Sequence, residues 1–164
     1  MEEKLRKLML AMIAYNNGDA KRIQHFIKVH ALAKLIGEEE KLDAKTLYIL
    51  EAAALTHDIG IRNSEKKYCT GKQQEVEGPP EAEKLLQKLG FAPEVTERVC
   101  WLIAHHHTYN GITGADYQIL VEADFLVNLY EDGVGMDAVK TAYARIFKTQ
   151  AGRRMCRTMY GFTD

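Results

Sequence analysis

The apolar residues of this chain recur with the spacing of an α-helix along nearly its whole length, and this constrains the fold more than any other feature. No convincing run alternates apolar with polar residues, as a half-buried strand would. No linker-like stretch, repeat or low-complexity tract divides the chain. The sequence therefore predicts an all-α fold, a single-domain bundle of about seven helices over residues 1–164 with its core at about 20–130.

Local signals give the expected helix boundaries. Asp19 and Asp43 are good N-caps, because their carboxylates can accept hydrogen bonds from the first backbone N–H groups of a helix. The polar stretch 59–78 is expected to be a loop, and Pro79 and Pro80 suit the first turn of the helix after it. The expected helices cover about residues 2–15, 20–37, 44–58, 79–90, 93–107, 116–132 and 136–160, the last divided into one or two.

Composition and charge narrow the class of protein. Hydrophobic residues make up 46% of the chain and charged residues 27%, which is ordinary for a soluble globular domain. The net charge of −1 argues against binding to a nucleic-acid polymer. Charged residues interleave with apolar ones in the first helix, so that segment is neither a signal peptide nor a membrane span. Three widely spaced cysteines without a CxxC pair are expected to be free thiols, and a cytoplasmic location is expected.

The histidines are the most informative polar residues. Six are present, and five lie in the middle or at the end of predicted core helices: His25, His57, His105, His106 and His107. Asp58 directly follows His57 at the end of the most apolar helix, and Asp124 lies inside the apolar run LVEADFLVNL. A buried carboxylate is costly unless something neutralises it. Convergence on a metal ion explains the set, since imidazole and carboxylate ligands suit zinc, manganese, iron or, less well, magnesium.

Each of these residues taken alone has an ordinary structural explanation. A single buried histidine is usually a hydrogen-bonded member of the core, and Asp124 alone could cap a helix or pair with a lysine. His30 and His107 are expected to be structural or to support the ligands. The metal hypothesis therefore depends on the set of residues and not on any one member.

Three segments resemble the HD-domain metal-dependent phosphohydrolases. HFIKVHALA is similar to the family's helix with an early histidine, AAALTHDIG to its His-Asp signature, and VEADFL to its Ala-Asp segment, over about residues 20–130. The resemblance implies that His25, His57, Asp58 and Asp124 hold a divalent metal ion (Mn, Fe, Zn, Co or Mg). It also implies that His57 and Asp58 carry the reaction, with Asp58 as metal ligand and orienter of the attacking water.

Members of this family with two metal ions add a histidine before one helix and a His-His pair after another. IAHHHTYNG supplies such a pair, for which His105 and His106 fit the family's spacing best. At the position of the remaining histidine this chain has Glu77, with Glu75 and Gln74 nearby. A glutamate could bind a second ion in its place. Alternatively, both glutamates are solvated loop residues and the histidines contact substrate or bound water, so the sequence leaves one and two ions open.

The resemblance implies hydrolysis of a phosphomonoester, phosphodiester or phosphoanhydride bond in a nucleotide or another small phosphorylated metabolite. Arg62 and Lys66, in the basic loop after the His-Asp doublet, are expected to bind substrate phosphate, the alternative being a solvated loop. Two other functions stay open: a dinuclear iron oxygenase of the same fold, and a non-catalytic binding module. No membrane partner is expected, and the chain is expected to be a monomer or a homodimer.

Overall fold

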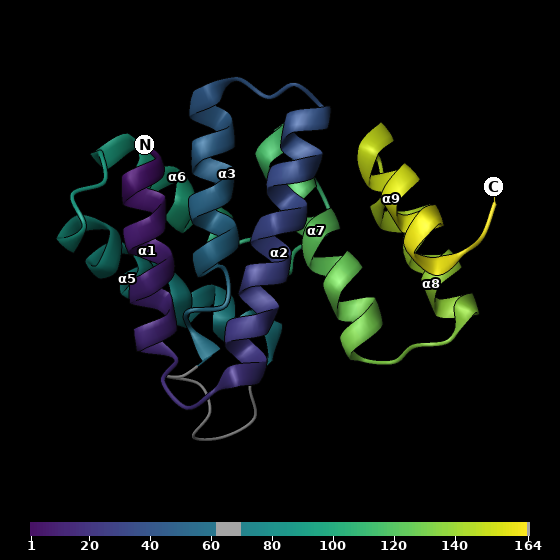
Figure 1. Cartoon of the computed structure of the whole chain (residues 1–164), viewed down its shortest axis with the longest axis horizontal. Coiled ribbons are helices and arrows are strands. Elements are labelled where there is room, and N and C mark those ends of the chain that lie inside the picture. The colour runs from purple at the N-terminus through teal and green to yellow at the C-terminus, as the bar shows by residue number, and fades with distance from the viewer. Residues whose placement is uncertain (62–69, 164) are drawn as a thin grey trace.

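The computed structural model describes residues 1–61 and 70–163 (Figure 1). Its regular elements over these residues are eight helices and no strand, which confirms the predicted all-α fold. The helices are α1 (Glu2–Tyr15), α2 (Ala20–Glu39), α3 (Ala44–Thr56), α5 (Gly71–Lys88), α6 (Pro93–Ile103), α7 (Ala115–Glu131), α8 (Met136–Ile146) and α9 (Gln150–Tyr160). None of these helices is both long and apolar enough to cross a membrane.

Helix α3 is the centre of the bundle. Every residue from Tyr48 to Thr56 is buried, and α3 packs against α1, α2, α6 and α7. The helix begins after Asp43, as predicted, because Asp43 Oδ1 accepts hydrogen bonds from the backbone N–H groups of Lys45 and Thr46. Because other helices surround α3, the His57–Asp58 doublet at its end lies in the interior of the protein.

Helices α2 and α7 pack against each other and against α3 (Figure 1). Asp19 caps α2 as predicted, since its side chain accepts a hydrogen bond from the backbone N–H of Arg22. Helices α8 and α9 lie on the outer side of α7, away from α1. The contact between α2 and α7 brings His25 and Asp124, which are far apart in the sequence, to the same place in the core.

The boundary predicted for α5 was wrong. The helix starts at Gly71, and Pro79 and Pro80 lie inside it instead of at its start. The start is fixed by a capping box: Thr70 Oγ1 accepts from the backbone N–H of Gln73, and Gln73 Oε1 accepts from the backbone N–H of Thr70. Inside the helix, prolines remove N–H donors, so packing has to stabilise this segment. Gly78 supplies such packing, because a Cβ there would meet Ile103 Cγ2 at 2.6 Å.

Helix α6 ends at Ile103, earlier than the predicted residue 107, and residues 104–107 lie in the turns that follow it. Helix α7 starts at Ala115 after Gly114, whose φ of 91° suits glycine. Asp116, predicted to start this helix, instead lies in its first turn and pairs with Arg98, with 2.8 Å between Oδ1 and Nη2. The early end of α6 determines which histidines of the triple reach the site.

Candidate metal centre

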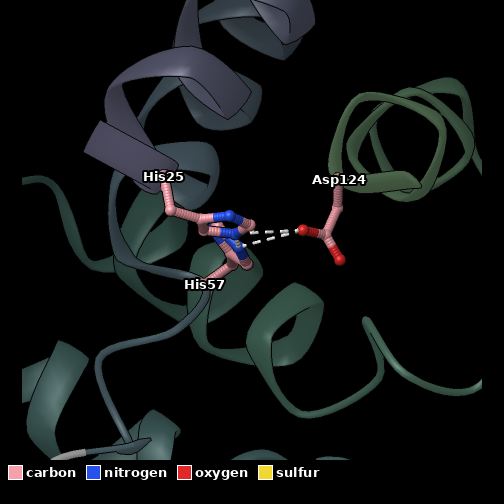
Figure 2. A group of neighbouring side chains, drawn as sticks. All are labelled: His25, His57 and Asp124. Carbon is pink, nitrogen blue, oxygen red and sulfur yellow. Dashed lines mark hydrogen bonds and ion pairs between the residues drawn. The ribbon is translucent and has the colours of Figure 1, made fainter. Parts of the chain in front are cut away.

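The structure brings the side chains of His25, His57, Asp58 and Asp124 together where α2, α3 and α7 meet; we call these four residues the first cluster. Asp124 Oδ1 is 3.2 Å from His25 Nε2 and 3.5 Å from His57 Nε2, and the two Nε2 atoms are 3.2 Å apart. Asp58 Oδ2 is 3.5 Å from His25 Nε2 and 3.6 Å from His57 Nε2. Figure 2 shows the two imidazoles against each other and facing the Asp124 carboxylate, which comes from a separate helix.

The outer hydrogen bonds of the two imidazoles turn their Nε2 atoms towards the cluster. His57 Nδ1 is 2.9 Å from the carbonyl oxygen of Ala54, and His25 Nδ1 is 2.8 Å from Glu131 Oε2. Both partners only accept, so both Nδ1 atoms donate, and each neutral ring then has its lone pair on Nε2. Two lone pairs and two carboxylates therefore converge, an arrangement of acceptors that repel one another until a cation or proton lies between them.

Buried atoms without hydrogen-bond partners support a cation at this place. Three buried side-chain atoms of the described residues have none: Asp124 Oδ1 and His106 Nε2 at this site, and Thr96 Oγ1 on α6. Leaving a buried polar atom unsatisfied is costly, so such atoms call for an explanation. A divalent ion held by His25, His57, Asp58 and Asp124 would satisfy Asp124 Oδ1, and the imidazole and carboxylate donors of the first cluster fit such an ion. His106 Nε2 faces Asp58 Oδ1, 3.6 Å away.

The ionisation of these groups is strongly coupled to their burial and to one another. Burial lowers the pKa of His57, but the carboxylates of Asp58 and Asp124 outweigh this effect and raise that pKa to about 9. Burial raises the pKa of Asp124, but the neighbouring His25 and His57 outweigh it and hold that pKa well below its usual range. The carboxylates are therefore anionic and attract positive charge, which either a proton on His57 or a bound metal ion can supply.

A second cluster adjoins the first and consists of Asp58, His106 and His107. One ligand atom from each of these residues lies within 4.8 Å of the others. His106 is buried, its Nδ1 donates to the carbonyl oxygen of Ile103 at 2.7 Å, and its Nε2 is 3.6 Å from Asp58 Oδ1. Burial, with the electrostatic effect of the neighbouring His106, lowers the pKa of His107 to about 4, so the His107 ring is neutral near pH 7. Asp58 is shared, with Oδ2 towards the first cluster and Oδ1 towards the second.

The structure places His107, and not His105, with His106. His105 stacks on Trp101, with ring centroids 4.1 Å apart, and its Nδ1 donates to the carbonyl oxygen of Trp101 at 2.7 Å. This follows from the end of α6 at Ile103, because the turn after it carries His106 and His107 towards Asp58. The sequence had favoured His105 and His106, on a helix that was expected to continue through all three histidines.

Glu75 and Glu77 of α5 lie differently with respect to the second cluster. Glu75 Oε1 accepts hydrogen bonds from the backbone N–H of His107 at 3.0 Å and from Thr108 Oγ1 at 2.9 Å, so it holds the histidine turn. Glu77 is exposed on the same helix. Gln74 Oε1 is 2.6 Å from His107 Nε2, which makes the amide the direct neighbour of the second cluster. The resemblance to the family had placed Glu77 at this position.

A cavity of about 310 Å³ opens beside the first cluster and is lined by His25, Asp58 and Asp124. Lys21, Arg22 and Asn128 lie in its wall, and none of them was singled out from the sequence. Helical spacing could have found all three, since Lys21 and Arg22 precede His25 by four and three positions and Asn128 follows Asp124 by four.

Two residues expected near substrate phosphate, Arg62 and Lys66, lie outside the described residues. His30 was expected to be structural or to support the ligands. Its Nε2 is 2.9 Å from Glu51 Oε2. That contact joins α2 to α3 and does not include a residue of either cluster.

Comparison with known proteins agrees with this architecture. The sequence model of the HD domain matches residues 22–147. A solved structure described as a predicted HD superfamily hydrolase, from an uncultured Thermotogales bacterium, is similar with a TM-score of 0.71 and 26% sequence identity, covering 96% of this chain and 85% of that one. A search of curated proteins gave no match. The family match spans well over half of the sequence and includes all four residues of the first cluster. This chain therefore belongs to the HD-domain family.

Proposed function

We propose that this chain is a metal-dependent phosphohydrolase that cleaves a phosphate ester or anhydride bond in a nucleotide or another small phosphorylated metabolite. The observation that carries the proposal is the convergence of His25, His57, Asp58 and Asp124, all acceptors, at the wall of an open cavity. The description of the similar Thermotogales protein as a predicted hydrolase agrees with this reading.

The residues of the first cluster would hold the ion through His Nε2 and carboxylate oxygen atoms. A bound divalent ion polarises a phosphoryl oxygen and lowers the pKa of a coordinated water. Asp58 lies between the two clusters and lines the cavity, so its carboxylate can accept a hydrogen bond from the attacking water and orient it. Hydrolysis adds this water to phosphorus, breaks the bond to the leaving oxygen, and transfers a proton to the leaving group.

Outside the two clusters the cavity wall is mixed in charge, because Lys21 and Arg22 lie in it together with Asp19, Glu131 and Asp132. Lys21 and Arg22 bring two cationic side chains to the wall beside His25, and such groups bind phosphate oxygens well. Arg22 also pairs with Asp19, with 3.1 Å between Nε and Oδ2, which fixes the guanidinium at the start of α2. A volume of about 310 Å³ is in the range of small-molecule sites. Phosphate binding by Arg62 and Lys66 remains a prediction.

Phosphate and pyrophosphate release from a panel of nucleotides and sugar phosphates, with added Mn²⁺, tests the proposal. Wild type is compared with Asp58→Ala and with Asp137→Asn, a change at an exposed carboxylate in the first turn of α8. Release by wild type and Asp137→Asn, lost in Asp58→Ala, is the expected result. Absence of release from a wild-type protein shown to hold metal would overturn it, and oxygen consumption by the iron-loaded protein would then favour the oxygenase alternative.

A further inference from the structure

Glu131, the last residue of α7, contacts His25 from the side opposite the first cluster. Its Oε2 is 2.8 Å from His25 Nδ1, whereas His25 Nε2 faces Asp124 and His57. Its other oxygen, Oε1, accepts from Lys28 Nζ at 2.5 Å, and the side chain is 13% exposed. The carboxylate is therefore held between an ammonium group and the outer N–H of a residue in the first cluster.

The partner of His25 differs in charge from those of the other imidazoles in the two clusters. His57 donates from Nδ1 to the carbonyl oxygen of Ala54, and His106 donates to that of Ile103. Both of those acceptors are neutral and belong to the last turn of the same helix. His25 instead donates to an ionised carboxylate on a different helix, and a hydrogen bond to a charged acceptor is about twice as strong as a neutral one.

Such a contact affects how an imidazole binds a metal. A carboxylate at Nδ1 fixes the tautomer with the lone pair on Nε2, fixes the orientation of the ring, and raises the basicity of Nε2. The same helix supplies Asp124, seven residues and about two turns before Glu131. Helix α7 thus presents one member of the first cluster directly and positions a second, His25, through its outer nitrogen.

We propose that Glu131 is a positioning residue for the metal centre, acting through His25 to strengthen ion binding; this rests on the proposed function only in that the first cluster binds a divalent ion. Lys28 supports the carboxylate from the solvent side and joins α2 to α7. An alternative in which Glu131 serves only as the partner of Lys28 predicts that the two side chains are equally important for ion binding. The two explanations therefore predict different effects of removing the Lys28 side chain on the affinity for the ion.

The test measures Mn²⁺ binding itself, by equilibrium dialysis of wild type, Glu131→Leu, Glu131→Gln and Lys28→Met. Glu131→Leu removes acceptor and charge and is expected to raise the Kd by about 10- to 100-fold. Glu131→Gln keeps an acceptor and loses the charge, so its Kd is expected between those of wild type and Glu131→Leu. Lys28→Met leaves the carboxylate on His25, and its Kd is expected within about twofold of wild type.

Two readouts separate positioning from folding. Thermal unfolding of the ion-free variants reports whether each is folded, and ¹⁵N NMR of zinc-loaded wild type is expected to show a proton on His25 Nδ1. Equal Kd values for wild type and both Glu131 variants would overturn the inference, as would a Lys28→Met effect as large as that of Glu131→Leu. If wild type itself binds neither Mn²⁺ nor Zn²⁺, the proposed function fails together with the inference. If wild type binds and the Glu131 variants bind equally, the inference alone fails.

Discussion

Gly152 packs directly against the carboxylate of Glu122, which is fully buried. The two oxygens of Glu122 accept hydrogen bonds from the backbone N–H groups of Lys148 and Thr149, from Thr149 Oγ1 and from Gln118 Nε2. This buried carboxylate is therefore satisfied by hydrogen bonds that hold the connection between α8 and α9 against α7. Only glycine leaves room for it, since a Cβ at position 152 would overlap Glu122 Oε2.

Gly152→Ala is therefore expected to lower the free energy of unfolding by about 2–4 kcal/mol, because the added methyl group displaces a buried, hydrogen-bonded carboxylate. Urea denaturation followed by circular dichroism measures the change. Gly135→Ala is the matched control, since a Cβ there would meet no atom of the described residues within 4 Å. The control is expected to cost less than about 1 kcal/mol; a loss equal to that of Gly152→Ala would contradict the packing argument.

A divalent ion is expected to stabilise the folded protein, because the first cluster exists only in the folded chain. At a free ion concentration of about one hundred times the Kd, the free energy of unfolding should rise by about 2.7 kcal/mol. Thermal unfolding with Mn²⁺ and with EDTA measures this difference. Asp124→Asn removes one charge from the cluster and should reduce the ion-dependent shift, whereas Asp137→Asn should leave it unchanged. An identical shift in Asp124→Asn would show that the ion binds elsewhere.

The two histidines on either side of His106 are expected to differ in their effect on activity. His107→Ala removes a member of the second cluster and should lower kcat/KM by about tenfold or more. His105→Ala removes a ring that stacks on Trp101, so it should lower stability and change kcat/KM much less. Steady-state kinetics on the substrate found in the release panel, with metal content measured for each variant, separates them. A larger loss of kcat/KM in His105→Ala than in His107→Ala would instead favour His105 and His106, the pair that the sequence spacing predicts.

The thiols of Cys100 and Cys156 are expected to react slowly in the native protein. Burial raises the pKa of both to about 11, so at pH 8 their thiolate fraction is roughly a hundredfold below that of a free cysteine. Iodoacetamide labelling, followed by mass spectrometry in a Cys69→Ser background, should therefore be slow before urea is added and fast afterwards. The native rate should rise as the pH is raised towards 11. Labelling of the native variant at the unfolded rate would contradict this expectation.

The first cluster could be predicted because its residues conflict with their surroundings. His57, Asp58 and Asp124 are polar or charged residues in segments otherwise built for a core, and a conflict of that kind is visible in a single sequence. The central position of α3 followed from its apolar composition, and the caps at Asp19 and Asp43 followed from the chemistry of helix ends.

Other parts of the site depended on where helices end, which the sequence signals less clearly. The Thr70–Gln73 capping box was present in the sequence, but the prolines at 79 and 80 suggested a later start. The choice between His105 and His107 depended on α6 ending at Ile103, a difference of about one turn that reverses which ring faces Asp58. For Lys21 and Arg22 the sequence offered only their helical spacing from His25, and the cavity beside them is visible only in the fold.

The shared carboxylate of Asp58 has a consequence for how the site fills with ions. Its Oδ2 faces His25 and His57, while its Oδ1 faces His106, so the two clusters draw on one negative charge. An ion in the first cluster would already neutralise much of that charge, and a second ion would then gain less from the same carboxylate. Occupancy by two ions would accordingly be stepwise, with unequal affinities, and partial loading would be a normal condition of the protein at low metal concentration.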